Sequence, residues 1–289
     1  MIVAERPKLG LAVTVCAGVA NMVLDATLIL VIPLGLEGAA LATSISQVIG
    51  GVIPVIYFAR KNTSQLSLTK TKFYGKALLR ATVNGSSELM SNISMSIVTI
   101  IYNFQLMRLA GEDGIAANGI IMYVAFIFIA MFLGFSVGTA PIIGYHYGAQ
   151  NTDELKSLLR KGATVMVVSG AIMSLVSILF ARPLSMIFAG YDPALLEMTA
   201  NGLRIHSTCF VFASLGIFGS SYFTALNNGL ISAIISFTRT LVFQVGALLL
   251  LPIFLDLNGV WLATPVSEVL SLILTVVLFI ANRKKYKYF

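Results

Sequence analysis

Long apolar runs separated by short polar connections dominate the chain. Each run holds about 20 residues or more, which is the length that an α-helix needs to cross the hydrocarbon core of a bilayer. The run 241–251 lacks the alternation of a membrane β-strand, so helices are the predicted spanning elements. The predicted spans are 9–32, 37–59, 78–107, 115–141, 158–181, 195–225, 230–254 and 259–281. The pattern therefore predicts an all-α polytopic membrane protein with eight transmembrane helices.

Composition supports this interpretation and excludes a soluble globular domain. Hydrophobic residues make up 57% of the chain and charged residues 11%, whereas soluble domains carry roughly 25% charge. The mean hydropathy is +0.91. The net charge of +7 lies on short segments between apolar runs and not on one basic face, so no nucleic-acid partner is predicted. The lipid bilayer is the expected surrounding.

No enzyme chemistry is indicated by the motifs of the chain. The sequence contains no HExxH or Walker A motif and no paired histidines. Its GxSxG match, GFSVG at 134–138, lies within a predicted span and fits the small-xxx-small pattern of helix packing. Neither hydrolysis nor a nucleotide-driven step is therefore expected. Cys16 and Cys209 lie inside apolar runs without the spacing of metal ligands. We therefore expect no cofactor and no metal other than a possible Na⁺.

The distribution of Lys and Arg predicts the orientation in the membrane. Of the 19 basic residues, 15 lie at the chain ends and in alternate connections on one side of the predicted spans. The opposite connections hold only Arg108, Arg182 and Arg204, and Arg239 lies within a span. Because cytoplasmic connections carry the excess of basic residues, both termini are predicted to be cytoplasmic in a multi-pass protein of the cell membrane.

An internal repeat indicates how the helices are organised. Residues 34–50 align with residues 255–271 at a constant offset of 221, with eight identities in seventeen positions. The second and eighth helices are then equivalent, and both run inward from the outer face. The two halves are accordingly predicted to be parallel repeats related by an axis along the membrane normal.

The repeat also predicts the domain organisation. Four helices precede the seventh and eighth in the second half, so the first half is expected to begin with four helices of its own, roughly 150 residues in length. We expect a missing N-terminal segment or a second chain to supply them. Residues 1–60 are then the last two helices of an N-terminal lobe, 61–76 a cytoplasmic linker, and 77–289 the complete C-terminal lobe of a 6+6 transporter.

Several segments together resemble one transporter family. They are NMVLDATLIL and LGLEGAALATSISQ in the first two helices, NGSSELMSNISMS in the third, PIIGYHYGAQNTDELKSLLRKG after the fourth, and LNGVWLATPVSEVL in the last. In order and spacing they resemble the multidrug and toxic compound extrusion (MATE) family. The resemblance implies twelve helices in two six-helix lobes, of which the first four are missing here. It also implies export of organic cations and drugs in exchange for Na⁺ or H⁺.

Three carboxylates lie within predicted spans: Asp25, Glu88 and Glu268. A charge at the bilayer centre costs about 2.5–3.5 kcal/mol on insertion scales, so each needs a partner, a proton or a water-filled cavity. Asn21 and Asp25 share a helix face at i, i+4 spacing, and Thr43 on the next helix lies at a similar depth in the outer half. Oxygen groups of this kind suit Na⁺ or a shared proton. The alternative is that Asn21 and Asp25 only hydrogen-bond neighbouring helices.

The resemblance implies roles for particular residues. An Asn-x-x-x-Asp pair and a Thr form the N-lobe cation site of some family members, and these positions are Asn21, Asp25 and Thr43 here. The backbone carbonyl of Ala39 is the fourth implied contact, and an aspartate of the absent first helix completes the site. An acidic residue of the seventh helix coordinates the cation in the sodium-coupled branch, which implies the same role for Glu88.

Polar residues also mark a candidate substrate cavity and a candidate ion pair. Asn84, Ser91, Asn92 and Thr99 share a helix face with Glu88 and are predicted to line a cavity. Arg239 lies within a span at similar depth. Its charge is expected to pair either with Glu88 or with Glu268, and the sequence leaves both partners open.

The combined features favour a secondary transporter that exports drug-like organic cations in antiport with Na⁺ or H⁺. One alternative is a flippase for a lipid-linked glycan, which a basic cavity would favour, whereas a single Arg239 among buried carboxylates favours cations. A second alternative is a non-transporting remnant or interaction subunit, which the absent helices suggest.

Overall fold

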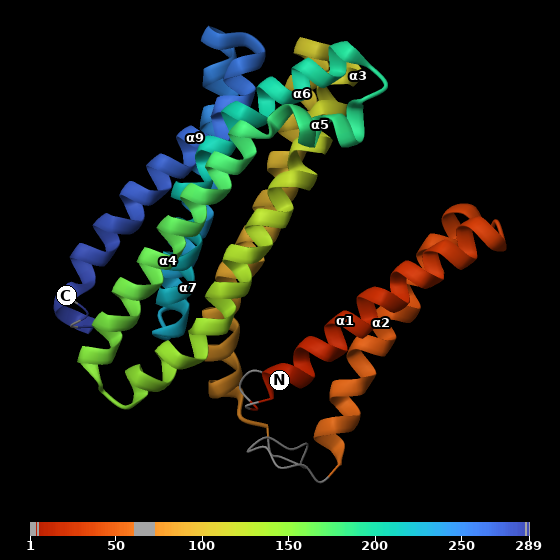
Figure 1. Cartoon of the computed structure of the whole chain (residues 1–289). Helices are drawn as coiled ribbons and strands as arrows, with labels where there is room; N and C mark the ends of the chain where they lie inside the picture. Colours follow the sequence, from red (N-terminus) through yellow and green to blue (C-terminus); the bar gives the residue numbers. More distant parts are fainter. Residues whose placement is uncertain (1–3, 5, 61–72, 287, 289) are drawn as a thin grey trace. The chain divides into compact units, whose positions relative to one another are not determined.

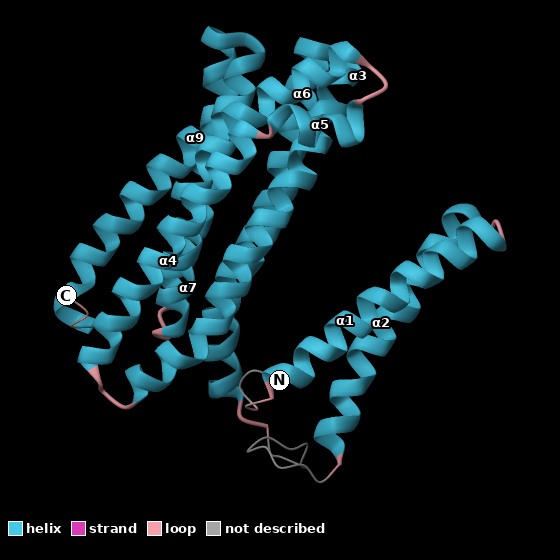
Figure 2. Cartoon of the chain, in the orientation of Figure 1, coloured by secondary structure: helices cyan, strands magenta, loops and turns pink. Residues whose placement is uncertain are grey.

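The computed structural model describes all residues except 1–3, 5, 61–72, 287 and 289. For residues 84, 86–88, 90 and 91 it describes the backbone and not the side chain. The described residues form helices joined by short turns and contain no strand (Figures 1 and 2). The elements are α1 (Pro7–Asp25), the π-helix η1 (Ala26–Val31), α2 (Gly35–Ala59), α3 (Gly75–Gly148), α4 (Thr152–Leu179), α5 (Ala181–Ala189), α6 (Pro193–His206), the 3₁₀-helix η2 (Ser207–Cys209), α7 (Phe210–Ala225), α8 (Gly229–Phe237), the π-helix η3 (Thr238–Gln244) and α9 (Val245–Tyr286). The predicted all-α class is confirmed.

Two of these helices reverse direction within their length. α3 is 74 residues long, which would make a straight helix of about 110 Å. The backbone of Gly111 has φ 65° and ψ −150°, and that of Asp256 in α9 has φ 47° and ψ −131°, so neither residue is helical. Figure 1 shows α3 running to one end of its unit and returning from it. Each long helix is therefore a pair of antiparallel helices joined at one residue.

The predicted spans all fall on helices. Six continuous helical stretches of the described chain are long and apolar enough to cross a membrane, and one of them, Gly229–Tyr286, has 58 residues. This stretch and α3 each hold two predicted spans, separated by the reversals at Asp256 and Gly111. Only the spans 9–32 and 158–181 extend beyond their helices, by one and two residues. The chain is a multi-pass membrane protein.

The chain divides into two compact units, Met1–Tyr74 and Gly75–Phe289. In the first unit, α1 and η1 pack antiparallel to α2. A Cβ atom added to Gly38 would lie 2.8 Å from the Leu28 carbonyl oxygen, and one on Gly50 would lie 3.5 Å from the Ala17 Cβ. The predicted linker lies mostly outside the described residues, and the division into lobes stays a prediction.

The hairpin of the first unit and the last hairpin of the second share their turn geometry. Gly35 and Asp256, which are 221 residues apart, both have positive φ angles, of 56° and 47°. Three residues after each, Gly38 and Gly259 approach the preceding helix so closely that a Cβ atom would lie within 3 Å of a backbone carbonyl oxygen. The repeat seen in the sequence therefore corresponds to a repeated helix–turn–helix.

The close approach of Gly259 leads to a stability prediction. A Cβ atom there would lie 2.4 Å from the Leu251 carbonyl oxygen, so Gly259→Ala must displace backbone and is expected to cost about 1–3 kcal/mol. Gly246→Ala, on the other arm of α9, is the matched control, because nothing lies within 4 Å of its added Cβ and alanine favours helix. Thermal unfolding in detergent measures the stability of both variants. Equal melting temperatures would contradict the close contact.

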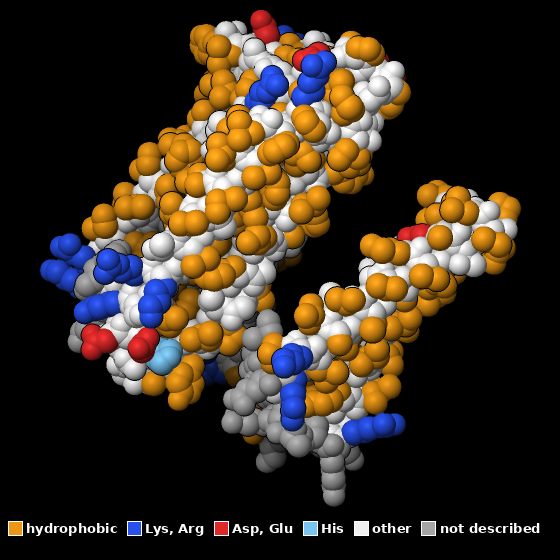
Figure 3. Space-filling model, viewed as in Figure 1, with side chains coloured by type: hydrophobic (Ala, Val, Ile, Leu, Met, Phe, Trp, Pro, Cys, Tyr) orange, Lys and Arg blue, Asp and Glu red, His pale blue; other side chains and the backbone are white. Residues whose placement is uncertain are grey.

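Apolar side chains lie both inside and outside the second unit. One buried cluster surrounds Trp261, with Leu106, Ile121, Leu203 and Leu248. A second, mainly aromatic cluster includes Phe218, Tyr222, Phe223 and Phe279. Many other large apolar side chains are exposed, and Figure 3 shows them covering the visible helix surfaces. Such a surface is suited to lipid and not to water.

Candidate functional site

The first unit carries the predicted Asn21 and Asp25 on the last two turns of α1. Both side chains are half-buried. Among the described residues, Asp25 forms no ion pair, and the buried Nδ2 of Asn21 has no hydrogen-bond partner. The π-helix η1 begins directly after Asp25, and single π-helical turns occur frequently at functional sites. A carboxylate and an unsatisfied amide therefore share one face next to an irregular turn.

Thr43 and Ala39 lie on α2 at the same height of the hairpin. The close approaches of Gly38 to Leu28 and of Gly50 to Ala17 fix the antiparallel register, which places Thr43 opposite the part of α1 between Asn21 and Asp25. The Thr43 hydroxyl donates to the Ala39 carbonyl at 3.0 Å, and the Thr43 side chain is exposed. The structure thus brings these two predicted ligands into contact with each other.

The predicted cavity residues of α3 are only partly described. The side chains of Asn84, Glu88 and Ser91 lie outside the described residues, although their backbone is helical. Asn92 and Thr99 are exposed on the surface of the unit. The Thr99 hydroxyl donates to the Met95 carbonyl at 2.8 Å.

Arg239 and Glu268 form a largely buried ion pair in the second unit. Arg239 lies in the π-helix η3 and Glu268 in the returning part of α9. The Arg239 Nε–H donates to Glu268 Oε1 at 2.8 Å, and Nη2 lies 2.7 Å from the same oxygen. Their side chains are 21% and 6% exposed. Of the two partners that the sequence left open for Arg239, the structure brings Glu268 into contact.

A buried polar network lies one to two helical turns from this pair, and sequence analysis missed it. The hydroxyl groups of Tyr102 and Thr264 lie 2.6 Å apart, and the Gln244 side-chain amide donates to Thr264 Oγ1 at 3.3 Å. Gln105 donates to the Leu248 carbonyl at 3.1 Å. The one available signal is the i, i+4 spacing of Thr264 and Glu268, which puts both on one face of α9.

Part of the Glu268 carboxylate remains unsatisfied. Its Oε2 atom and the hydroxyl of Ser271 are buried without hydrogen-bond partners. Both face Gly216 of α7, where an added Cβ would lie 3.7 Å from Oε2 and 3.8 Å from the serine Oγ. Buried acceptors of this kind are normally satisfied by a water or a proton. The described residues hold no group of three or more His, Cys, Asp or Glu that could bind a metal ion.

These features define a class: a polytopic helical membrane protein that keeps ionisable side chains inside its apolar helices. Residues 89–248, more than half of the chain, match the family model MatE. The chain belongs to the MatE family, and the resemblance found in the sequence is confirmed. Members of this family are transporters and not enzymes.

The curated relatives are distant and longer. The multidrug export protein MepA of Staphylococcus haemolyticus is 24% identical over 262 residues, which cover 90% of this chain and 56% of MepA. The probable multidrug resistance protein NorM of Thermotoga maritima is 24% identical over 175 residues, which cover 60% of this chain and 37% of NorM. The chain therefore spans about half the length of the MepA relatives that it matches.

Solved structures show the same fold. A MATE protein crystallised in complex with MaL6 superposes with a TM-score of 0.89 at 22% identity, over 97% of this chain and 63% of that one. A MOP superfamily transporter from Pyrococcus furiosus, described as having a binding pocket of reverse polarity, has a TM-score of 0.87 at 23% identity, over 96% and 62% of the two chains. The fold is that of a MATE transporter.

Proposed function

We propose that the chain functions in a secondary transporter that exports drug-like organic cations in antiport with Na⁺ or H⁺, without a cofactor. The observation that carries this proposal is the state of Asp25. It is a half-buried carboxylate on a membrane-length helix, it has no ion pair among the described residues, and it shares a helix face with the unsatisfied amide of Asn21. MepA and NorM, which are named as multidrug proteins, support the substrate class.

The physical argument concerns the charge of Asp25. An ionised carboxylate in the hydrocarbon region costs several kcal/mol unless a cation or a proton neutralises it. Na⁺ prefers oxygen ligands, which Asn21, Asp25, the Thr43 hydroxyl and the Ala39 carbonyl all offer, while a proton needs only the carboxylate. If the affinity of this site for the ion differs between the inward-facing and outward-facing states, ion binding is coupled to the rocking of one lobe against the other.

The same proposal includes the division of the chain into lobes and the source of the four further helices. Residues 1–60 form the last two helices of an N-terminal lobe, 61–76 the linker and 77–289 the six-helix C-terminal lobe. A preceding segment or a second chain supplies four further helices. The intact mass of the protein extracted from its native membrane tests this assignment: a value near 31.0 kDa requires a second chain, and a mass larger by roughly 150 residues requires the segment.

Transport in proteoliposomes tests the function. The protein as isolated from its native membrane is reconstituted, a Na⁺ or pH gradient is imposed, and movement of a fluorescent organic cation such as ethidium is followed. Gradient-driven movement is expected with one of the two ions. A lipid-linked glycan flippase or a non-transporting subunit would show none, and its absence with both gradients would contradict the proposal. The pairing of Arg239 with Glu268 weighs against the flippase, because it neutralises a positive charge that a negatively charged glycan carrier would otherwise attract.

We further propose the orientation that the basic residues indicate, with both termini in the cytoplasm and the protein in the cell membrane. Cysteine labelling from either side of the membrane tests it. A single cysteine introduced in the turn between α3 and α4 is expected to react only after the cytoplasmic side is opened. Labelling of intact cells at this position would contradict the orientation.

Glu88 is the second proposed coupling carboxylate, and Asn84, Ser91, Asn92 and Thr99 line the proposed substrate cavity beside it. If Glu88 exchanges a proton for the substrate, substrate affinity changes with pH. Glu88→Gln is expected to flatten this pH profile. Binding of the dye, measured by fluorescence across the pH range, reports the effect, and an unchanged profile would make Glu88 a structural residue.

A further inference from the structure

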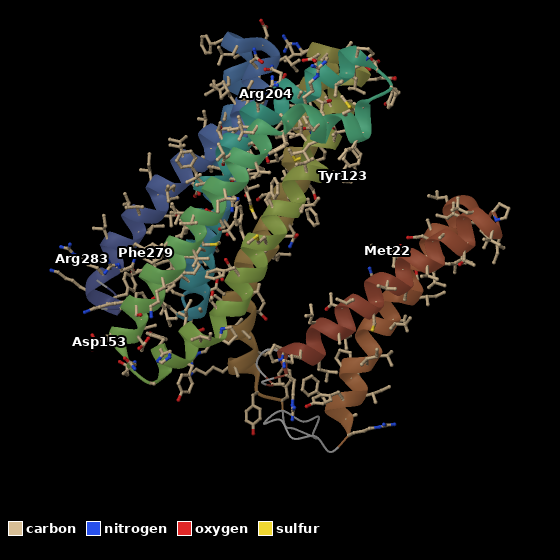
Figure 4. The ribbon with its side chains drawn as sticks, viewed as in Figure 1. Met22, Tyr123, Asp153, Arg204, Phe279 and Arg283 are labelled. Carbon is tan, nitrogen blue, oxygen red and sulfur yellow. The ribbon has the colours of Figure 1, made fainter. Side chains whose placement is uncertain are left out.

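A cavity of about 460 Å³ opens between α4, α7 and α9 in the second unit. This volume lies within the range of about 300–1,000 Å³ that is typical of small-molecule sites. Its wall is formed mainly by apolar side chains, among them Leu159, Ala163, Leu215, Phe218, Leu272 and Val276. Phe279, which Figure 4 labels, also contributes to the wall.

The few polar groups of the wall are already satisfied or charged. The Thr275 hydroxyl donates to the Ser271 carbonyl at 2.8 Å, and the Tyr288 hydroxyl donates to the Phe279 carbonyl at 3.1 Å. Two cations, Lys156 and Arg160, also line the cavity. The cavity therefore offers an apolar interior and positive charge, with no further demand for hydrogen bonds from these hydroxyl groups.

The two cations lie one turn apart on α4 and are exposed. In the part of the chain that the structure describes, neither forms an ion pair. The acidic Asp153 and Glu154 precede them in the first turn of α4 and do not line the cavity. The last turn of α9 adds further basic residues, and Figure 3 shows Lys and Arg gathering at this end of the unit.

The depth of the cavity matches one leaflet of a bilayer. Counted from the start of α4 at 1.5 Å per residue, Lys156 lies about 6 Å and Arg160 about 12 Å along the helix. Leu272 lies about 21 Å from the end of α9 by the same rise. Half of the hydrocarbon core is about 15 Å thick. The cavity thus extends from the charged end of the helices to the region of the bilayer centre.

We propose that this cavity binds one anionic phospholipid, with an acyl chain between α4, α7 and α9 and its phosphate at Lys156 and Arg160. The apolar wall selects the hydrocarbon chain. The two unpaired cations select a negative headgroup, because Arg and Lys bind phosphate by charge-assisted hydrogen bonds and basic residues near a membrane surface favour anionic lipid. The site lies within the second unit and does not depend on the proposed transport activity.

Lipid retention tests the proposal. The purified protein is equilibrated with equal amounts of phosphatidylglycerol and phosphatidylcholine, which differ in headgroup charge, and bound lipid is counted by native mass spectrometry. Retention of phosphatidylglycerol is expected, and Lys156→Gln with Arg160→Gln should lower it on the order of tenfold or more. The matched control is Arg283→Gln with Lys284→Gln, which removes the same two charge types at the same end without touching the cavity wall.

Two further measurements separate the parts of the site. Ala163→Phe fills the cavity while keeping both cations, and it is expected to abolish retention of the anionic lipid. Inorganic phosphate alone should not displace the lipid, because it cannot occupy the apolar wall. Equal retention of the two lipids, an equal loss in the control variant, full retention in Ala163→Phe, or displacement by phosphate would each overturn the proposal. Circular dichroism and thermal unfolding verify that each variant is folded.

Discussion

Replacing Asp25 with asparagine is expected to abolish ion-driven export while leaving the protein inserted in the membrane. Asparagine keeps the size and the oxygen of the side chain but can neither hold a negative charge for Na⁺ nor take up a proton. Binding of the coupling ion then no longer differs between the two states of the transporter, and the gradient cannot shift their populations. Dye movement in proteoliposomes is expected to fall to the rate of passive leak under either gradient.

Glu37→Gln provides the matched control for this experiment. Glu37 is an exposed carboxylate in the first turn of α2 within the same hairpin, so its replacement changes the charge by the same amount outside the proposed site. Its gradient-driven transport is expected to stay at the level of the unaltered protein. Undiminished transport by a correctly inserted Asp25→Asn variant would remove Asp25 from the coupling site.

Arg239→Leu is expected to cause the largest loss of stability. It leaves the Glu268 carboxylate, whose side chain is 6% exposed, without its counter-charge and with both oxygens unsatisfied. Removing one member of a buried ion pair costs about 3–5 kcal/mol, chiefly because the remaining charge stays buried. Thermal unfolding of the purified protein in detergent measures the loss.

A double-mutant cycle and an exposed ion pair serve as controls for the Arg239 result. Arg239→Leu combined with Glu268→Leu removes both charges, so much of the lost stability is expected to return. Arg182 and Glu197 lie 3.1 Å apart with side chains that are both 60% exposed, and Arg182→Leu should cost no more than about 1 kcal/mol. A double variant as unstable as Arg239→Leu would mean that packing and not charge holds this region together.

The membrane helices were predictable because a run of about 20 apolar residues indicates a spanning helix without any information on its neighbours. The reversal at Asp256 was also predictable, since the offset of 221 residues places Asp256 at the same turn as Gly35. α5 was not predicted, because residues 181–189 look like the end of a span followed by a connection. Its buried residues, Ala181, Ser185 and Ala189, recur every four positions, and small side chains at that spacing give a weak hydrophobic signal.

Contacts between helices were less accessible to sequence reasoning. Tyr102 and Thr264 are separated by 162 positions in the chain, so only packing brings their hydroxyl groups together. Depth along a helix placed Arg239 near the expected level of Glu88 and did not exclude Glu268 as its partner. The bond from Thr43 to the Ala39 carbonyl reflects the competition of threonine hydroxyls for the carbonyl four residues earlier. A residue pattern contains little information on which acceptor such a hydroxyl takes.

The two π-helices change how the faces of their helices are counted. An α-helix advances by about 100° per residue, and a π-helical turn takes up one residue more than an α-helical turn. A helical wheel drawn from Asn21 and Asp25 therefore loses its phase within η1, which ends at Val31, and a wheel drawn through α8 is out of phase by about one residue beyond η3. Substitutions chosen on 26–31 or on 245–255 to match a face of the preceding helix need this correction, or they will probe the wrong side.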